Sequence, residues 1–428
     1  FTRVMVFRLL SSPEILSAQP EIILNVNMDD ISKRWRKAVK YDFDRVIERR
    51  GTNCIKWDHA DLFFGRNDLL PMWVADMDFE SPPEVVEAIV SRAKHGIYGY
   101  TARSKAYYES IVNWLYRRHG WKIKEEWIAH APGVVAAVHI AIMALSHPGD
   151  RVVVQTPVYY PFFKAIKETG RQLILNPLKE SDGRYSMDFE DLERKVDSRT
   201  KIIILCSPHN PVGRVWRRDE LSRLGEICLN RNIKIISDEI HSDLVFGNNK
   251  HIPTAMISDE VSSITLTCVA PSKTFNLAGL SSAAVISSSS ELLGEYSNMM
   301  STVGAGMSNV FGTVALETAY NNGERWLEQL LEYINGNFVY MRDFLKTNFP
   351  ELRVAELEGT YLAWIDFRNT GMSVEELRSF LYEKAKVGFE DGSIFGEEGE
   401  GFMRVNLACP RAIVEEAMKR LITARKSD

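Results

Sequence analysis

The sequence lacks the features that mark disulfide-stabilised, zinc-binding and membrane-spanning proteins. Its 428 residues include only five cysteines, an odd number, and no Cys-x-x-Cys pair. The cysteines are widely separated, which favours free thiols in a reducing cytoplasm over a disulfide framework or a metal site. No apolar run approaches the roughly 20 residues that a transmembrane helix needs. We therefore expect a cytoplasmic protein with no bound metal and no membrane partner.

An excess of one charge is also missing. The chain has 52 Lys and Arg against 57 Asp and Glu, a formal net charge of −5. This balance gives no reason to expect nucleic acid or an anionic membrane as a partner. At roughly 100–200 residues per domain, the length indicates two or three domains. The first 28 residues are apolar but include Arg3 and Arg8 and show no clear signal-peptide pattern, so we expect residues 1–40 to be an appended extension.

The middle of the chain alternates short β-branched runs with helical patterns. The strand-like runs are apolar along nearly their whole length and occupy residues 151–155, 171–175, 201–205, 233–237, 264–268 and 282–286. Helical patterns separate several of them, at 160–170, 188–196 and 217–231. Such runs are typical of parallel strands buried on both faces, and the alternation implies right-handed crossovers. The sequence predicts a doubly wound α/β domain with a mainly parallel sheet.

The pattern changes after about residue 325. Helices and strands are mixed there, with helices at 326–347, 373–386 and 411–425 and strands at 358–367 and 402–407. This mixture predicts a smaller α+β domain at 326–428, and we expect the segment 41–77 to pack with it. The large domain is expected at 78–325.

Two ionisable residues follow predicted strands, at the sheet edge where open α/β sheets bind ligands. Lys273 lies in APSKTF after the strand 264–268, and Asp238 ends the strand 233–237 in SDEIHSD. A lysine considered alone is more often a surface loop residue than a ligand-binding one. An aspartate considered alone is a helix N-cap about as often as it is a ligand-binding residue. Their shared position favours a ligand site.

Four further residues belong to similar motifs. Asn210 in SPHNPVG is a turn residue whose amide can also donate to a phenolate oxygen. Gly133 opens an apolar helix, whose free N–H groups suit a phosphate. Tyr159 in TPVYYPFF either packs in the core or stacks on a flat ring. Arg404 lies in the apolar strand FMRVNL, and a buried arginine requires a carboxylate, from the protein or from a substrate.

The order glycine-led helix, Tyr, Asn, Asp, Lys, Arg resembles fold-type I pyridoxal-phosphate (PLP) enzymes of aminotransferase class I/II, from about residue 41 onward. The segments PMWVADMDFESPPEV, SDEIHSDL, APSKTFNLAGL and FMRVNLACP are similar to cystathionine β-lyases of the MalY/PatB type, which include cystalysin. The resemblance implies the aspartate-aminotransferase fold and β-elimination from cysteine S-conjugates such as cystathionine, giving pyruvate, ammonia and a thiol. Aminotransfer between an amino acid and a 2-oxo acid is the alternative, since both reactions first remove the Cα proton. A third reading is a non-catalytic binding protein on the same fold.

The resemblance also implies a role for each motif residue around the cofactor ring. Lys273 carries the cofactor and moves the Cα proton, which makes it catalytic together with Asp238 and Tyr159. Asp238 pairs with the pyridine nitrogen, whose protonated form draws electrons from the substrate. Tyr159 stacks on the ring, and Asn210 and His241 lie near its hydroxyl oxygen O3′. Many relatives have a tyrosine where this chain has His241.

The phosphate and the amino-acid substrate are assigned by the same resemblance. The phosphate is bound by Gly133, Val134, Val135 and Ser272, joined by Tyr100 from the partner subunit of a homodimer. Many relatives have a further phosphate-binding arginine where this chain has Ser281. The substrate is bound by Arg404, which holds the carboxylate, and by Ala75, Tyr160 and Asn210. Tyr159 or Tyr160 is expected to help protonate the leaving sulfur.

Overall fold

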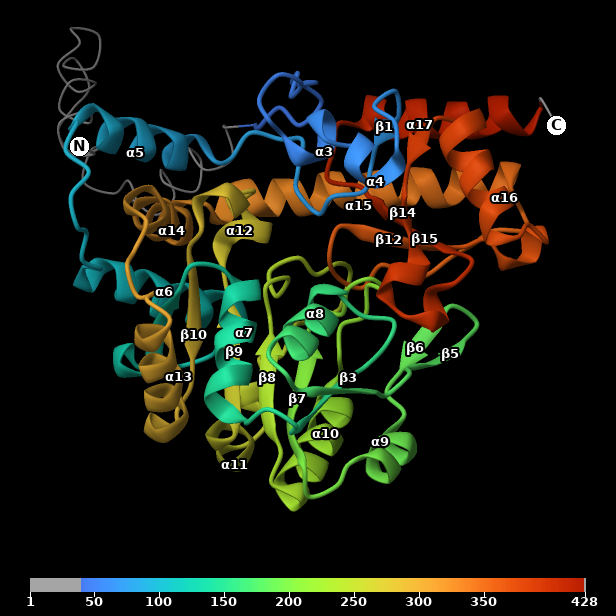
Figure 1. Ribbon diagram of the computed structural model, residues 1–428. Helices are drawn as coiled ribbons and strands as arrows, with labels where there is room; N and C mark the ends of the chain where they lie inside the picture. The colour runs from blue at the N-terminus through green and yellow to red at the C-terminus, as the bar shows by residue number, and fades with distance from the viewer. Residues whose placement is uncertain (1–39, 427–428) are drawn as a thin grey trace, which may run out of the picture. The chain divides into compact units, whose positions relative to one another are not determined.

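A seven-stranded sheet forms the centre of the unit that begins at Phe43 (Figure 1). The computed structural model describes residues 40–426, so the extension predicted at 1–40 lies outside the described residues except for its last residue. The strands, in the spatial order β2-β10-β9-β8-β7-β3-β4, are β2 (Ile128–Ala131), β3 (Arg151–Val154), β4 (Gln172–Leu175), β7 (Thr200–Cys206), β8 (Lys234–Asp238), β9 (Thr265–Val269) and β10 (Ala283–Ile286).

All six strands predicted for this region are present, but one of them runs in the other direction. Strands β4, β3, β7, β8 and β9 run parallel to one another, whereas β10 is antiparallel to both β9 and β2. The parallel orientation expected for 282–286 is therefore wrong. Residues 270–282 form a short helix and a 3-10 turn at the carboxyl end of β9, so the chain never crosses back to the other end of the sheet.

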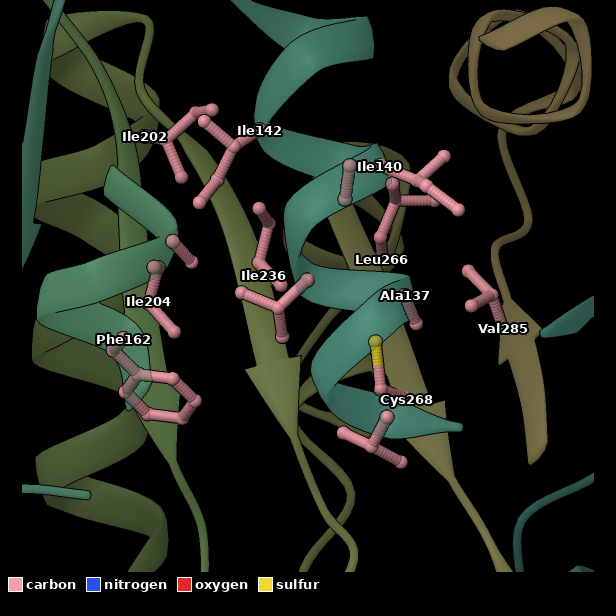
Figure 2. Packing of buried hydrophobic residues seen from close by; sticks show 14 of the residues in the cluster. Ala137, Ile140, Ile142, Phe162, Ile202, Ile204, Ile236, Leu266, Cys268 and Val285 are labelled. Atoms are coloured by element: carbon pink, nitrogen blue, oxygen red, sulfur yellow. The ribbon is translucent and has the colours of Figure 1, made fainter. Parts of the chain in front are cut away.

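Helices cover both faces of the sheet, as a doubly wound fold requires. One face packs under α7 (Val134–Leu145), α8 (Pro161–Glu168) and α13 (Ser290–Thr302), and the other under α9 (Phe189–Lys195), α10 (Arg218–Arg231) and α11 (Asp259–Ser263). Side chains alternate along β7, with Ile202 and Ile204 in the first layer and Ile203 and Leu205 in the second. Figure 2 shows the first layer, where strand isoleucines meet α7. Each such side chain contributes about 1.5–3 kcal/mol.

The C-terminal elements surround a smaller sheet with the order β11-β12-β15-β14. They are α15 (Glu324–Asn348), β11 (Arg353–Val354), β12 (Leu362–Asp366), α16 (Val374–Arg378), β13 (Val387–Gly388), β14 (Glu390–Asp391), β15 (Phe402–Asn406) and α17 (Arg411–Arg425). The helix predicted at 373–386 is α16 continued by a π-helical stretch, Ser379–Lys384. β1 (Leu70–Pro71) pairs with β13, so the N-terminal segment joins these elements. The domain boundaries at 41–77, 78–325 and 326–428 stay a prediction.

Several shorter elements complete the described chain. They are α3 (Ile55–Asp58), α4 (Asp61–Phe64), α5 (Pro83–Lys94), α6 (Lys105–His119), α12 (Pro271–Thr274), α14 (Val310–Asn322) and the hairpin of β5 (Lys179–Ser181) and β6 (Arg184–Ser186). Among them, α5 and α6 both pack on α14. In the part of the chain that the structure describes, no helix has both the length and the apolar character that crossing a bilayer requires.

Candidate active site

A cavity of about 650 Å³ opens at the carboxyl ends of the parallel strands. Ten of the residues singled out in the sequence line it: Ala75, Gly133, Val134, Val135, Tyr159, Asn210, Asp238, His241, Ser272 and Lys273. Ligands of open α/β sheets bind at this edge, because the loops that follow neighbouring strands converge there. The motifs are separated by tens of residues in the sequence, and the sheet brings them to one site.

Lys273 lies in α12, directly after β9, and points toward the N-terminal segment. Its Nζ donates a hydrogen bond to the carbonyl oxygen of Ala75 at 2.5 Å. Burial lowers the pKa of Lys273 to about 8, although the nearby carboxylate of Asp76 acts in the opposite direction. A useful fraction of this amine is therefore neutral near physiological pH, as a nucleophile or a base must be.

Asp238 ends β8, is buried and lines the cavity. Its Oδ1 accepts a hydrogen bond from the backbone N–H of Ile240 at 3.1 Å, and no ion pair to it occurs within residues 40–426. Burial raises the pKa of Asp238 to about 7. A turn follows β8, so Asp238 caps no helix and the N-cap interpretation is wrong. A buried carboxyl group with so few partners suits a cationic N–H group in the cavity.

Asn210 and His241 present polar atoms to the same cavity. The Oδ1 of Asn210 accepts from Nη1 of Arg404 at 2.8 Å, which orients the amide and leaves its NH₂ group to donate. Burial holds the pKa of His241 well below its usual range, so the ring is neutral. Its Nδ1 has no hydrogen-bond partner in the described part of the chain. These groups suit a polar oxygen on a ring bound between them.

The N-terminus of α7 forms one wall of the cavity. Gly133 precedes the helix, and the first backbone N–H groups, from Val134 onward, have no carbonyl one turn earlier to bind. Ser272 and Ser281 add hydroxyl groups to the same cavity. Helix N-termini attract anions through these N–H groups and the helix dipole, so this wall suits a phosphate.

Arg404 is buried in β15, and its side chain meets a carboxylate of the protein itself. Glu390 in β14 stands opposite it in the antiparallel register, and its Oε2 accepts from Nη2 of Arg404. Nη2 also donates to the carbonyl oxygen of Trp73 at 3.1 Å. The sequence left open whether the partner was the protein or a substrate. It gave no signal for Glu390, because the pairing depends on a strand of two residues.

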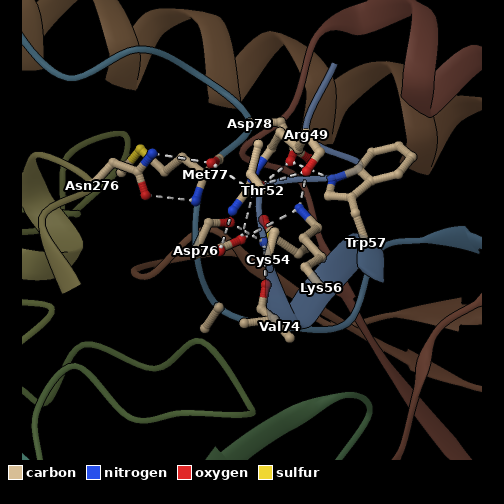
Figure 3. A network of polar contacts seen from close by, with 12 residues as sticks. Arg49, Thr52, Cys54, Lys56, Trp57, Val74, Asp76, Met77, Asp78 and Asn276 are labelled. Atoms are coloured by element: carbon tan, nitrogen blue, oxygen red, sulfur yellow. Dashed lines mark hydrogen bonds and ion pairs between the residues drawn. The ribbon is translucent and has the colours of Figure 1, made fainter. Parts of the chain in front are cut away.

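A network of ion pairs fixes the loop that carries Ala75 (Figure 3). Arg49 donates to Asp76 and Asp78, and buried Lys56 donates to Asp78 at 2.6 Å. The loop is also held by Tyr361, whose hydroxyl donates a hydrogen bond to the Ala75 carbonyl at 2.8 Å. Lys273 therefore faces a rigid acceptor. Sequence reasoning named Ala75 but missed Asp76 and Tyr361, whose role appears only in the folded chain.

Three predicted residues are not part of the cavity wall: Arg404, which is linked to it by its hydrogen bond to Asn210, Tyr100 and Tyr160. Tyr100 is 96% exposed, in the irregular segment between α5 and α6. Tyr160 is half-buried and packs its ring against Phe395 at 5.8 Å between centroids. Cys206 is buried and also lines the cavity. Burial raises the pKa of its thiol above the usual range, so the thiol keeps its proton.

The site and the fold together define a class of protein. The sequence profile described as aminotransferase class I and II matches residues 67–421. The chain belongs to this family, and the predicted family and fold are confirmed. The arrangement of a partly neutral lysine, a buried aspartate and a helix N-terminus also fits the amine-reactive, cationic and anionic parts of PLP.

The branch of the family follows from its relatives. The chain is 44% identical to cystathionine β-lyase PatB of Bacillus subtilis, over 90% of this chain and 99% of PatB. It is 35% identical to protein MalY of Escherichia coli, over 90% of this chain and 98% of MalY. The crystal structure of cystalysin from Treponema denticola, which contains PLP, has a TM-score of 0.88 at 38% identity and covers 91% of this chain and all of cystalysin. The chain is thus a member of the MalY/PatB-type branch.

Proposed function

We propose that this protein is a PLP-dependent carbon–sulfur β-lyase that acts on cysteine S-conjugates such as cystathionine and releases pyruvate, ammonia and a thiol. The observation that carries the proposal is that partly neutral Lys273 and buried Asp238 line the same cavity. The similarity to cystathionine β-lyases over nearly the whole chain supports this reaction over aminotransfer. Five cysteines without disulfides support the cytoplasm as its location.

PLP, when bound, supplies an aldehyde that takes up an amine and a protonated ring that withdraws electrons from Cα. Lys273 has two roles in the proposal. It holds the cofactor covalently, and its freed amine removes the Cα proton of the substrate. The pKa near 8 makes the amine available for both. Asp238 keeps a proton on the ring nitrogen, and Asn210 donates its NH₂ group toward O3′.

A tyrosine hydroxyl is proposed to protonate the leaving sulfur. Burial raises the pKa of Tyr159 above its usual range, so its hydroxyl keeps a proton at any pH at which the enzyme works. Tyr159 lines the cavity, and Tyr160 lies beside it with 5.6 Å between ring centroids. Tyr159 is the better placed of the two, because Tyr160 is not part of the cavity wall.

The substrate class is tested with a panel of β-substituted amino acids. Holoenzyme is incubated with cystathionine, S-methyl-L-cysteine, cysteine, serine and alanine, and pyruvate, ammonia and thiol are each quantified. Equal amounts of pyruvate, ammonia and the released sulfur product (a thiol, or sulfide in the case of cysteine) are expected from the sulfur compounds, and none from alanine. Release of pyruvate from none of the sulfur compounds would contradict the proposal.

Arg404→Lys is expected to raise KM for amino-acid substrates by roughly 10- to 150-fold, because a charged hydrogen bond of about 1.5–3 kcal/mol is lost. The planar guanidinium of arginine donates hydrogen bonds to both oxygens of a carboxylate, whereas the lysine ammonium acts as a point charge. The visible spectrum of the bound cofactor should be unchanged. Steady-state kinetics and absorbance measure the two effects, and an unaltered KM would place the carboxylate site elsewhere.

We also propose a homodimer in which Tyr100 of the partner subunit completes the phosphate site. In the single chain, Ile97, Tyr98 and Tyr100 are each more than half exposed. Exposed apolar side chains that follow one another closely are typical of protein interfaces. Ser281 stands where many relatives have a phosphate-binding arginine, so a hydroxyl from the partner subunit carries more of the binding.

Tyr100→Phe is therefore expected to weaken PLP binding by roughly 10- to 150-fold, the effect of losing one hydrogen bond to a charged group. Tyr98→Phe is the matched control, because the Tyr98 hydroxyl donates to the carbonyl of Ala93 in its own chain. PLP titration at several protein concentrations, together with light scattering, measures affinity and mass. A monomer that binds PLP as tightly as the assembled form would contradict both the dimer and the shared site.

A further inference from the structure

Both hydrogens on one nitrogen of the Arg404 guanidinium are already engaged by the protein. Nη2 donates to the carbonyl oxygen of Trp73 at 3.1 Å and to Oε2 of Glu390. Nη1 donates to Asn210 at 2.8 Å. Nε is buried without a hydrogen-bond partner among residues 40–426. The Arg404 and Glu390 side chains are 3% and 8% exposed, so water replaces none of these contacts easily.

The geometry of a guanidinium makes Nη2 the nitrogen that a second carboxylate needs. A carboxylate binds bidentately either to the end of the group, through Nη1 and Nη2, or to its side, through Nε and Nη2. Both modes use Nη2. An incoming carboxylate must therefore displace the Trp73 carbonyl, which is fixed in the backbone, or the Glu390 side chain, which can rotate.

We propose that Glu390 is a specificity-determining residue that competes internally with the substrate: its carboxylate holds Arg404 in the free enzyme and must leave Nη2 when the substrate's α-carboxylate binds. This inference rests on the proposed function only for the assignment of Arg404 to that carboxylate. The carboxylates of Glu390 and of a ligand repel each other when both lie at Arg404. The site therefore binds every carboxylate ligand, including the substrate, more weakly than it would without Glu390, and ligands with few other contacts are excluded.

Release of Arg404 is expected to be coupled to uptake of a proton by Glu390. Burial raises the pKa of Glu390 above its usual range even though Arg404 lowers it, and a second carboxylate nearby raises it further. Protonated Glu390 no longer competes as an anion, so the competition is strongest above this pKa and vanishes below it. The charged and titratable groups that act on Glu390 or feel its charge are Arg404, Lys273, Tyr159, Tyr160 and Tyr382.

The test measures binding of glycine, which has an α-carboxylate but no leaving group, to wild-type and Glu390→Gln holoenzyme. The variant keeps the shape of the side chain and removes its charge. We expect glycine to bind roughly ten-fold more tightly or better to Glu390→Gln, as followed by the visible absorbance of the cofactor. Methylamine, which has no carboxylate, should bind both proteins equally. Since neither probe undergoes elimination, the result does not depend on whether the enzyme is a lyase.

Asp391→Asn is the matched control. Asp391 follows Glu390 but binds Arg378 at 2.6 Å and Ser393, away from Arg404, so this variant should bind glycine like the wild type. Unchanged or weaker glycine binding by Glu390→Gln would overturn the proposal, because a residue that only orients Arg404 would aid binding. If Glu390→Gln does not fold, calorimetry of the wild type in two buffers near neutral pH decides: binding of glycine should be accompanied by uptake of more protons than binding of methylamine, whose amine is fully protonated there like that of glycine, and equal uptake would reject the coupling.

Discussion

Lys273→Ala is expected to abolish turnover, with a loss of at least about 10³-fold, because one amine supplies both the covalent link and the general base. Lys273 lines the cavity, and its pKa of about 8 is unusual for a lysine. No second lysine lines this cavity in the described part of the chain. Pyruvate release measures the rate. Borohydride reduction followed by peptide mass spectrometry should attach PLP at residue 273 in the wild type and nowhere in the variant.

Lys164→Ala is the control for this experiment. Lys164 is 69% exposed on α8, and its one ion pair within residues 40–426 is with Glu168, one helical turn away. The control should keep the wild-type rate and the PLP adduct at Lys273. Pyruvate release by Lys273→Ala at the wild-type rate would remove Lys273 from the mechanism.

Asp238→Asn is expected to retain bound PLP but to lose roughly 10²- to 10³-fold in rate, the effect of removing one aimed electrostatic group from an active site. Asparagine fills the same space, yet it cannot hold a proton on the ring nitrogen as a carboxylate does. Titration with PLP and the rate of pyruvate release separate the two effects. An unchanged rate would leave Asp238 with a purely structural role.

Glu239→Gln gives the matched comparison, because this neighbouring carboxylate is also buried but binds His251 at 2.8 Å and Ser237 and does not line the cavity. It should lower the melting temperature, since a buried carboxylate loses its charge and weakens its hydrogen bonds to His251 and Ser237, while most of the rate remains. If both variants lost rate equally, the effect of Asp238→Asn would reflect damage to the fold around β8.

The strands and the residues at their ends could be predicted because the signals are local. The six apolar runs are continuous, and the motifs around Asp238 and Lys273 follow them directly. The direction of β10 could not be predicted from the sequence, because it depends on whether residues 270–282 cross from one end of the sheet to the other. β2 also escaped prediction, since IAHA has only four residues and a histidine.

The surroundings of Arg404 and Ala75 show the same limit within the site. Arg404 could be recognised as an arginine that needs a carboxylate, but Glu390 reaches it only through the register of β14 and β15. The bond from Lys273 to Ala75 joins residues 198 positions apart. The first contact depends on the register of two C-terminal strands and the second on the packing of the N-terminal segment against α12, and neither leaves a periodic trace in the sequence.

Counting turnovers in the absence of any 2-oxo acid tests most directly whether the enzyme is a lyase. S-methyl-L-cysteine is added in large excess to holoenzyme, and pyruvate, methanethiol and the cofactor's visible spectrum are followed together. A lyase regenerates its starting form in each cycle, so pyruvate and thiol should accumulate far beyond one equivalent per active site while the spectrum persists. An aminotransferase stops when its cofactor has accepted one amino group, so a halt at one equivalent or less, with loss of the visible band, would contradict the β-lyase assignment.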